Sequence, residues 1–273
     1  MRAKIFLFGL MAILILATCD VVTTDIEEEG NNPVDPENPD YEPPNVSVIA
    51  GIHQGDTLFQ DNISVKWRGN NKKCEYSYNL DKKGWSSWKK DSVAKFNYLN
   101  EGHHQFSVKA RYNAEDVQEE PIIIDFYVDA IQGPALWIRD KRNRATPHDT
   151  LTVEIVTEES PEMAMSSIQL FYETEHIKVL SCQPAEDSEF LSSRDFIHTV
   201  QLDNPEGRLS AYLGITTQSE TENAESGAIF LLKIETLHTG TSIISFGDEC
   251  SFRTINNEKI SINEKVRGVI EIE

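Results

Sequence analysis

From residue 45 onward the sequence is a series of short runs in which apolar and polar residues alternate. Clusters of Gly, Asn, Asp and Pro separate the runs, and helical periodicity is nearly absent. In the run 104–112, Phe106, Val108 and Ala110 alternate with polar residues, so one side of a strand would face a core and the other side water. This pattern predicts an all-β chain folded as β-sandwiches.

The first block of runs spans residues 45–130, and the breaker segment 131–134, Ile-Gln-Gly-Pro, ends it. We therefore expect a domain boundary there and a second domain at 135–273, which gives two β-sandwiches in tandem. The expected strands of the first block are 46–50, 63–67, 74–80, 94–99, 104–112 and 122–130. Those of the second block are 135–141, 150–157, 166–173, 177–182, 195–202, 208–216, 228–235, 241–248 and 268–273, with a hairpin turn at 204–207.

The first block resembles a known fold family. Its order is CEYSYNLDKKGWSSWKK, then KFNYLNEGHHQFSVKARY, then a closing IIIDFYV. This order is similar to fibronectin-III-like or immunoglobulin-like sandwiches, and closest to the triple-tyrosine type found beside sensor propellers. The resemblance implies a spacer or an interaction platform.

The second block resembles the cohesin domain and related cellulose-binding sandwiches of jelly-roll type. The strings that carry the resemblance are DTLTVEIV, SSIQLFYETEHIKVL, ESGAIFLLKIETLHTGTSIISF and the closing GVIEIE. Glu173 stands where the family usually has Asp. The resemblance implies a protein-binding module, because cohesins hold dockerins, but the identity of the partner does not transfer.

Alternation assigns faces to the strands of the second block. Ile168, Leu170 and Tyr172 form one inward set, and the 208–216 and 228–235 runs have inward sets of the same kind. The resemblance implies that these strands share one sheet. The expected binding patch is therefore four outward residues, whose exposed apolar side chains would mark an interface. These are Phe171, Tyr212, Ile229 and Leu231.

The four cysteines allow few bonds. Cys19 is assigned to an anchor, which leaves an odd number in an exported chain. In the cohesin order the strands of Cys182 and Cys250 are neighbours, so the resemblance implies that a disulfide between them is feasible, the alternative being two buried thiols. Cys74 lies in an aromatic strand, where we expect a buried, inert thiol.

The N-terminus has the layout of an export signal. Arg2 and Lys4 precede an apolar run, 5–17, that is too short to cross a bilayer. The string Leu-Ala-Thr-Cys at 16–19 resembles the lipobox of bacterial lipoproteins, which implies a signal peptide at 1–18 and lipid on Cys19. We thus expect a protein of the bacterial cell envelope, lipid-anchored on the periplasmic or cell-surface side.

The segment 19–44 is rich in acids and prolines, with no Lys or Arg. It cannot bury enough apolar surface to offset the entropy of ordering it, and its like charges and prolines favour an extended chain. We interpret it as a disordered stalk that carries the folded part away from the membrane.

Charge and motifs narrow the function. A net charge of -20 argues against nucleic acid as a partner, because phosphate binding needs a basic surface. The sequence has no CxxC, HExxH, GxSxG or Gly-rich phosphate loop, so we expect no enzyme, no cofactor and no metal site. His103 and His104 are adjacent and would face opposite sides of a strand. Asp140, Asp149 and Glu154 lack the spacing of a calcium loop.

Two alternatives to protein binding remain open. A carbohydrate-binding module that takes part in polysaccharide binding or degradation would use Trp85, Trp88 and Trp137 as a row of exposed rings stacking on sugars. Packing of the first two at a turn is the competing interpretation. A structural envelope spacer would show no patch, cleft or aromatic row.

Overall fold

The computed structural model describes residues 32–217 and 224–273. The chain divides into two units, Met1–Pro43 and Pro44–Glu273. Within the described ranges the regular elements are all strands, and no helix there has the length and apolar character needed to span a membrane. Cys19, the predicted signal peptide and the first part of the predicted stalk lie outside the described residues.

The described part of the predicted stalk is a run of turns and not an extended chain. Three backbone bonds of 3.1, 2.9 and 3.0 Å close successive four-residue turns at 32–35, 35–38 and 38–41. Each turn has Asn or Asp first and Pro second, which suits a turn because Pro fixes φ and the short polar side chain bonds the backbone two residues on. The expectation of an extended segment is therefore wrong over 32–41.

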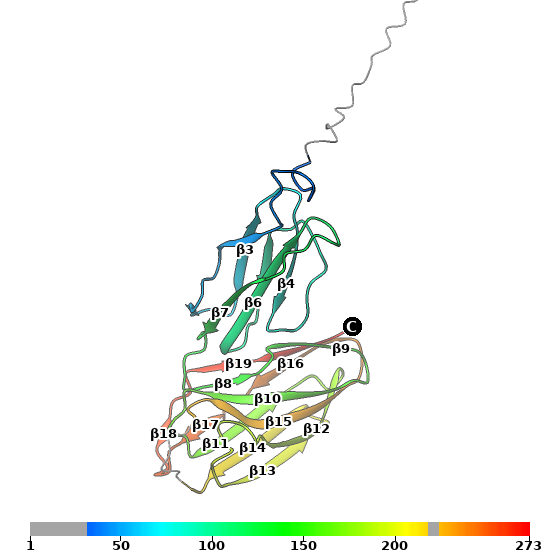
Figure 1. The fold of residues 1–273 in the computed structure, drawn as a ribbon. Coiled ribbons are helices and arrows are strands. Elements are labelled where there is room, and N and C mark those ends of the chain that lie inside the picture. The colour runs from blue at the N-terminus through cyan, green and yellow to red at the C-terminus, as the bar shows by residue number, and fades with distance from the viewer. Residues whose placement is uncertain (1–31, 218–223) are drawn as a thin grey trace, which may run out of the picture. The chain divides into compact units, whose positions relative to one another are not determined.

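Residues 46–128 form a sandwich of two sheets (Figure 1). One sheet has the order β1-β3-β5 and the other β2-β7-β6-β4. Their inward residues form one core around Trp67, Phe106 and Phe126. The strands are β1 (Val46–Ala50), β2 (Thr57–Leu58), β3 (Ile63–Gly69), β4 (Glu75–Leu80), β5 (Val93–Phe96), β6 (Gly102–Arg111) and β7 (Ile122–Val128).

Residues 135–272 form a second, larger sandwich with its own core. One sheet has the order β12-β15-β10-β8-β19, and the other runs β13-β14-β11-β16-β20-β9, with β17 and β18 branching from β11. The strands are β8 (Ala135–Ile138), β9 (Arg142–Ala145), β10 (Thr150–Glu158), β11 (Met165–Phe171), β12 (Ile177–Pro184), β13 (Phe196–Asp203), β14 (Arg208–Ile215), β15 (Gly227–Thr236), β16 (Gly240–Phe246), β17 (Ser251–Arg253), β18 (Lys259–Ile260), β19 (Glu264–Val266) and β20 (Gly268–Ile272).

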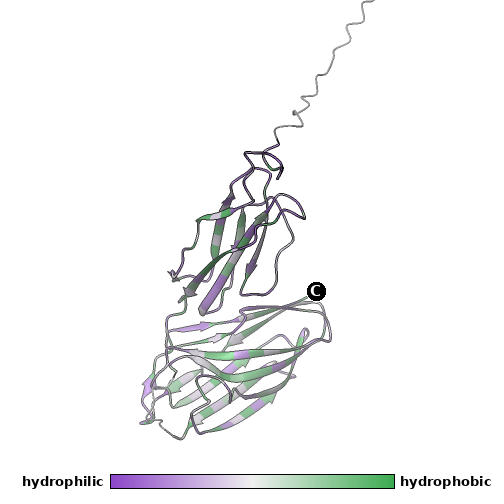
Figure 2. Cartoon of the chain, in the orientation of Figure 1, coloured by the Kyte–Doolittle hydropathy of each residue, from purple (hydrophilic) through white to green (hydrophobic). Residues whose placement is uncertain are grey.

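The predicted fold class is confirmed. The chain is all-β, and the predicted strands lie within a few residues of observed ones. Hydrophobic and hydrophilic segments alternate along the strands, as Figure 2 shows. The sequence did not predict the short strands β2, β9, β17, β18 and β19, which have too few residues to show a period.

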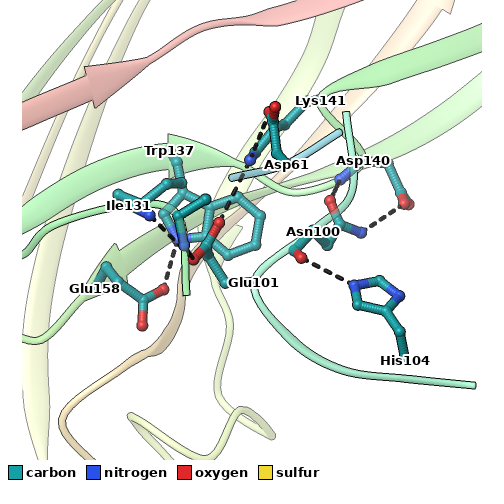
Figure 3. Close-up of polar contacts among 10 residues, drawn as sticks. Asp61, Asn100, Glu101, His104, Ile131, Trp137, Asp140, Lys141 and Glu158 are labelled. Atoms are coloured by element: carbon teal, nitrogen blue, oxygen red, sulfur yellow. Dashed lines mark hydrogen bonds and ion pairs between the residues drawn. The ribbon is translucent and has the colours of Figure 1, made fainter. Parts of the chain in front are cut away.

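Polar contacts join the two cores at the linker (Figure 3). Glu101 accepts bonds from the backbone N–H of Ala130 and Ile131, at 2.7 and 3.1 Å. Its other oxygen lies 3.4 Å from Nζ of Lys141, which is only 3 % exposed and also lies 3.1 Å from Asp61. A buried cation is thus paired with two carboxylates of the first sandwich. The division of residues 45–273 into two domains at 131–134 stays a prediction.

Candidate functional site

The candidate site is the outer face of β11, β13 and β14, where exposed apolar, aromatic and small polar side chains lie next to one another. In an antiparallel pair, residues opposite each other share a face. The register places Thr199, Tyr212 and Ser167 in one row across the three strands. The next row is Ile197, Gly214 and Met165. We name this surface the hollow face and define it by Met165, Ser167, Gln169, Phe171, Ile197, Thr199, Gln201, Ser210, Tyr212 and Gly214.

The hollow face contains a shallow hollow of about 420 Å³. Gly214 is one of its lining residues, and a Cβ there would contact Ile197 Cγ1 at 3.4 Å. Arg253 of β17 closes one side, and its guanidinium donates to the carbonyl of Asn257. The other lining residues are Met165, Ser166, Ser167, Ile197, His198, Thr199, Tyr212, Leu213 and Ser251.

Three apolar or aromatic side chains of the hollow face are open to solvent. Ile197 is 68 % exposed, Phe171 41 % and Tyr212 40 %. None of the ten residues that define the face carries a charge, although the chain has a net charge of -20. Arg208 and Asp203, which pair at 3.7 Å, lie in the same row across the strands as Phe171. The centre of the face is therefore uncharged and partly apolar, with the Arg208–Asp203 pair in the row of Phe171 and Arg253 beside the hollow.

The layer beneath the hollow face is part of the core of the second sandwich. Ile168, Leu170, Leu209 and Ala211 are fully buried, so the inward sets predicted for these strands are confirmed. Tyr172 donates through its hydroxyl to Asn204 Oδ1 at 2.7 Å.

The side chain of Asn204 in turn bonds the backbone of Val179 on the opposite sheet, at 3.0 and 2.9 Å. Burial, and then the Asp203 carboxylate, raises the pKa of Tyr172 to about 12, so the hydroxyl stays a neutral donor.

The prediction that Ile229 and Leu231 belong to the same patch is wrong. Both lie on β15, which is in the opposite sheet from β11 and β14. Ile229 is fully buried because a bulge opposite the Ile155–Val156 step breaks the alternation. Its carbonyl accepts from the N–H of Ala185. Leu231 is half-buried against a small second cluster that contains Trp137. Phe171 and Tyr212 are outward as predicted.

Of the two alternatives for Cys182 and Cys250, the disulfide is not formed: Cys74, Cys182 and Cys250 are all free thiols, with Cys182 buried and Cys250 half-buried. Cys182 lies on β12 of one sheet, whereas Cys250 follows β16 of the other sheet and bonds the backbone of Gln169. Burial raises the pKa of the Cys182 thiol to about 12. Cys74 is buried, as expected.

The tryptophans do not form a sugar-stacking row. Trp137 is 1 % exposed and donates through Nε1 to Glu158 at 2.9 Å. Lys109 Nζ lies 4.4 Å from the centre of the Trp85 ring, and the Arg111 guanidinium lies 4.5 Å from the centre of the Trp88 ring. We name these four residues with Glu75, which pairs with Arg111 at 2.8 Å, the tryptophan ladder.

The remaining candidates for chemistry lie apart. His103 pairs with Asp125 at 3.3 Å on the exposed side of β6, and His104 pairs with Asp81 at 2.9 Å on the buried side. Asp140 bonds Asn100, Asp149 bonds Thr146, and Glu154 pairs with Arg139. No group of three or more metal-binding side chains occurs within residues 32–217 and 224–273.

A larger hollow of about 800 Å³ is lined by residues of β10 and β15, by the segment 183–189 and by His198 of β13. Its lining is polar and acidic, with Glu186, Asp187 and Glu189 at the rim and the Arg139–Glu154 pair inside. It lacks the exposed apolar side chains of the hollow face, so it is the weaker candidate for a protein interface.

Comparison with known proteins gives a fold likeness. No protein-family model and no curated protein matches the chain. Among solved structures, it is similar to the sixth cohesin of scaffoldin B from Acetivibrio cellulolyticus, at 11% identity and a TM-score of 0.42 over 52% of this chain and 100% of the cohesin.

A second similar structure is a type I cohesin, Coh-OlpC, from Clostridium thermocellum, at 19% identity and a TM-score of 0.41 over 52% of this chain and 95% of that one. A non-cellulosomal cohesin from the archaeon Archaeoglobus fulgidus matches at 11% identity and a TM-score of 0.38, over 51% and 90% of the two chains.

Of the ten residues that define the hollow face, the predicted patch contained only Phe171 and Tyr212, and it missed every residue of β13, among them Ile197 and Thr199. The signal was present, because the run 195–202 was a predicted strand and the turn at 204–207 joins it to the next one. Counting back from that turn would have placed Ile197 opposite Gly214 and Thr199 opposite Tyr212.

Proposed function

We propose that the chain is a non-catalytic lipoprotein of the bacterial cell envelope that binds a protein partner through the hollow face. The observation that carries the proposal is a hollowed sheet face with an uncharged centre and exposed Ile197, Tyr212 and Phe171. Exposed apolar patches of this kind mark interfaces, and aromatic residues with few charges are typical of interface cores. The sequence resemblance to cohesins supports a dockerin-like module as one class of partner.

The proposed anchor would complement the proposed binding role of the hollow face. A lipid on Cys19 would hold one end of the chain at a membrane, and the second sandwich would hold another protein there. One acyl chain gives only marginal membrane binding, so stable anchoring needs the two or three chains of a lipoprotein.

A pull-down tests the binding face. The mature full-length protein and the double variant Phe171→Ser/Tyr212→Ser are immobilised and exposed to the secreted and envelope proteins of the source bacterium. Trp85→Ser is the matched control, because Trp85 is 43 % exposed but lies on the other sandwich. A partner kept by wild type and Trp85→Ser but lost by the double variant supports the proposal. Equal retention by all three contradicts it.

Metabolic labelling tests the anchor. Cells that express the wild-type chain or Cys19→Ser are grown with a radioactive fatty acid, and the membranes are separated from the soluble fraction. We expect label and membrane association for wild type and neither for Cys19→Ser. An unlabelled wild-type protein would overturn the anchor and leave the hollow face unaffected.

A further inference from the structure

The β13 strand is a free sheet edge that is built unlike the other edges. Within the part of the chain that the structure describes, it pairs with β14 on one side only, in a regular register of eight residue pairs from Phe196 to Asp203. The run FIHTVQLD contains no Lys, Arg or Pro. In Figure 1, β13 lies at the margin of the second sandwich. Natural proteins protect such edges, because unpaired backbone groups are a template for another strand.

The other edge strands carry that protection. The β12 edge has a bulge between Val179 and Ser181 and ends in Pro184. The β1 edge has a bulge between Val48 and Ala50. The segment 86–89 covers β4 with backbone bonds of 2.7 to 3.0 Å. The remaining edges β2, β5, β9, β18 and β19 have two to four residues each.

One hydrogen bond shows which backbone N–H and C=O groups of β13 face β14 and which face the open edge. The N–H of Thr216 donates to the carbonyl of Asp195 at 2.8 Å, in the same register as the β13–β14 ladder. Antiparallel ladders alternate, so odd-numbered residues of β13 bond β14 and even-numbered ones point their N–H and C=O at the open edge. The even-numbered residues are Phe196, His198, Val200 and Leu202.

The open edge borders the hollow. Ile197 and Thr199 of β13 line the hollow, and Ile197 is the most exposed large side chain of the hollow face. A strand laid against β13 would present every second side chain on this same face, beside Ile197. Backbone bonds would give affinity, and the hollow would select an apolar side chain.

We propose that β13 binds an extended segment of another protein, which adds as a further strand to the β13-β14-β11 sheet. The inference rests on the proposed function and names the form of the partner segment. The segment carries no net negative charge, because the chain it joins has a net charge of -20. The same charge opposes a second copy of this chain as the occupant.

A peptide titration on the mature full-length protein tests the edge. The probe is the capped peptide Lys-Thr-Val-Thr-Val-Thr-Lys, with a Glu-ended version as its charge control. Binding is followed by amide hydrogen exchange. We expect the Lys-ended peptide to bind tighter than the Glu-ended one and to slow exchange at His198, Val200 and Leu202.

His198→Pro is the decisive variant, because it removes an N–H that points at the open edge and breaks no ladder bond to β14. His198→Ala is its control, since it removes the same exposed side chain and keeps the N–H. We expect His198→Pro to weaken the peptide at least tenfold relative to His198→Ala, because the two variants lack the same side chain and differ in the N–H.

Three results would contradict the proposal that β13 binds an extended segment. They are no peptide binding up to millimolar concentration, equal binding by His198→Pro, and a dimer in sedimentation that His198→Pro abolishes. The proposed function fails separately. If the pull-down partner is retained by His198→Pro but lost by Phe171→Ser/Tyr212→Ser, the hollow face is supported as the binding surface and strand addition at β13 is wrong.

Discussion

The chain presents two surfaces with exposed aromatic side chains, and they differ in what the rings already contact. In the tryptophan ladder, Lys109 and Arg111 lie over the Trp85 and Trp88 rings. On the hollow face, Tyr212 is exposed to a similar degree as Trp85, yet it borders a cavity. The difference teaches that exposure alone does not mark a binding site, because a ring already covered by a cation has less surface to offer a ligand.

The largest expected effect separates the two sides of β11. Ile168→Ala removes a fully buried side chain and should lower the free energy of unfolding by about 3 kcal/mol. Phe171→Ala, on the outward side, should cost less than about 1 kcal/mol. Urea unfolding of both variants measures this, with Ser167→Ala as a control. Similar losses for Ile168→Ala and Phe171→Ala would mean that the hollow face is part of the core.

A smaller effect is the pH dependence of the stability of the first sandwich, which contains the tryptophan ladder. Burial opposes a charge on His104, but its bonds to Asp81 and to the Asn100 carbonyl raise the pKa of His104 above its usual 6.5. Burial likewise opposes the charge of Asp81, yet the His104 bond lowers the pKa of that carboxyl below 3.8. The stability from this pair is therefore complete between about pH 4 and pH 6.5.

The pair's stability is lost as pH rises through the raised pKa of His104 or falls through the lowered pKa of Asp81. We expect a loss on the order of 1 kcal/mol in unfolding free energy between pH 6 and pH 9, as for a charge-assisted hydrogen bond. His104→Gln should lack this decline, and His103→Gln should keep it, because His103 is exposed. A decline that His104→Gln leaves unchanged would refute the assignment.

Disrupting the tryptophan ladder should lower the free energy of unfolding only modestly. Arg111→Ala removes the cation over Trp88 and the partner of Glu75, and should destabilise the chain by about 1 kcal/mol. Acrylamide should then quench tryptophan fluorescence more strongly, as the Trp88 ring opens. Partner retention in the pull-down should stay unchanged, and a loss of the partner would place the ladder in the interface.

The smallest effect is the dependence of partner binding on salt. Because the centre of the hollow face is uncharged and Arg208 is paired with Asp203, retention of the partner should change less than about twofold between 0.05 and 0.5 M NaCl. A steep decline would show that charges outside this face carry the binding, with the acidic hollow over β10 and β15 as the next candidate.

Much of the fold could be predicted from the sequence. Strands of five or more residues show a period of two, so their existence and their inward residues, such as Ile168 and Leu209, were readable. Half of the predicted patch was right about exposure, since Phe171 and Tyr212 are outward. The binding roles of these residues, the anchor at Cys19 and the fibronectin-III-like character of the first block stay predictions.

Alternation in the sequence by itself determined that this chain is all-β and which side of each long strand is inward, because side-chain direction follows from local backbone geometry. Only the tertiary structure decided which strands share a sheet. It placed β15 opposite β11, buried Ile229 at a bulge, separated Cys182 from Cys250 and left β13 at an open edge. Strand pairing joins residues far apart in the chain, and the period of a single strand contains no information about its neighbours.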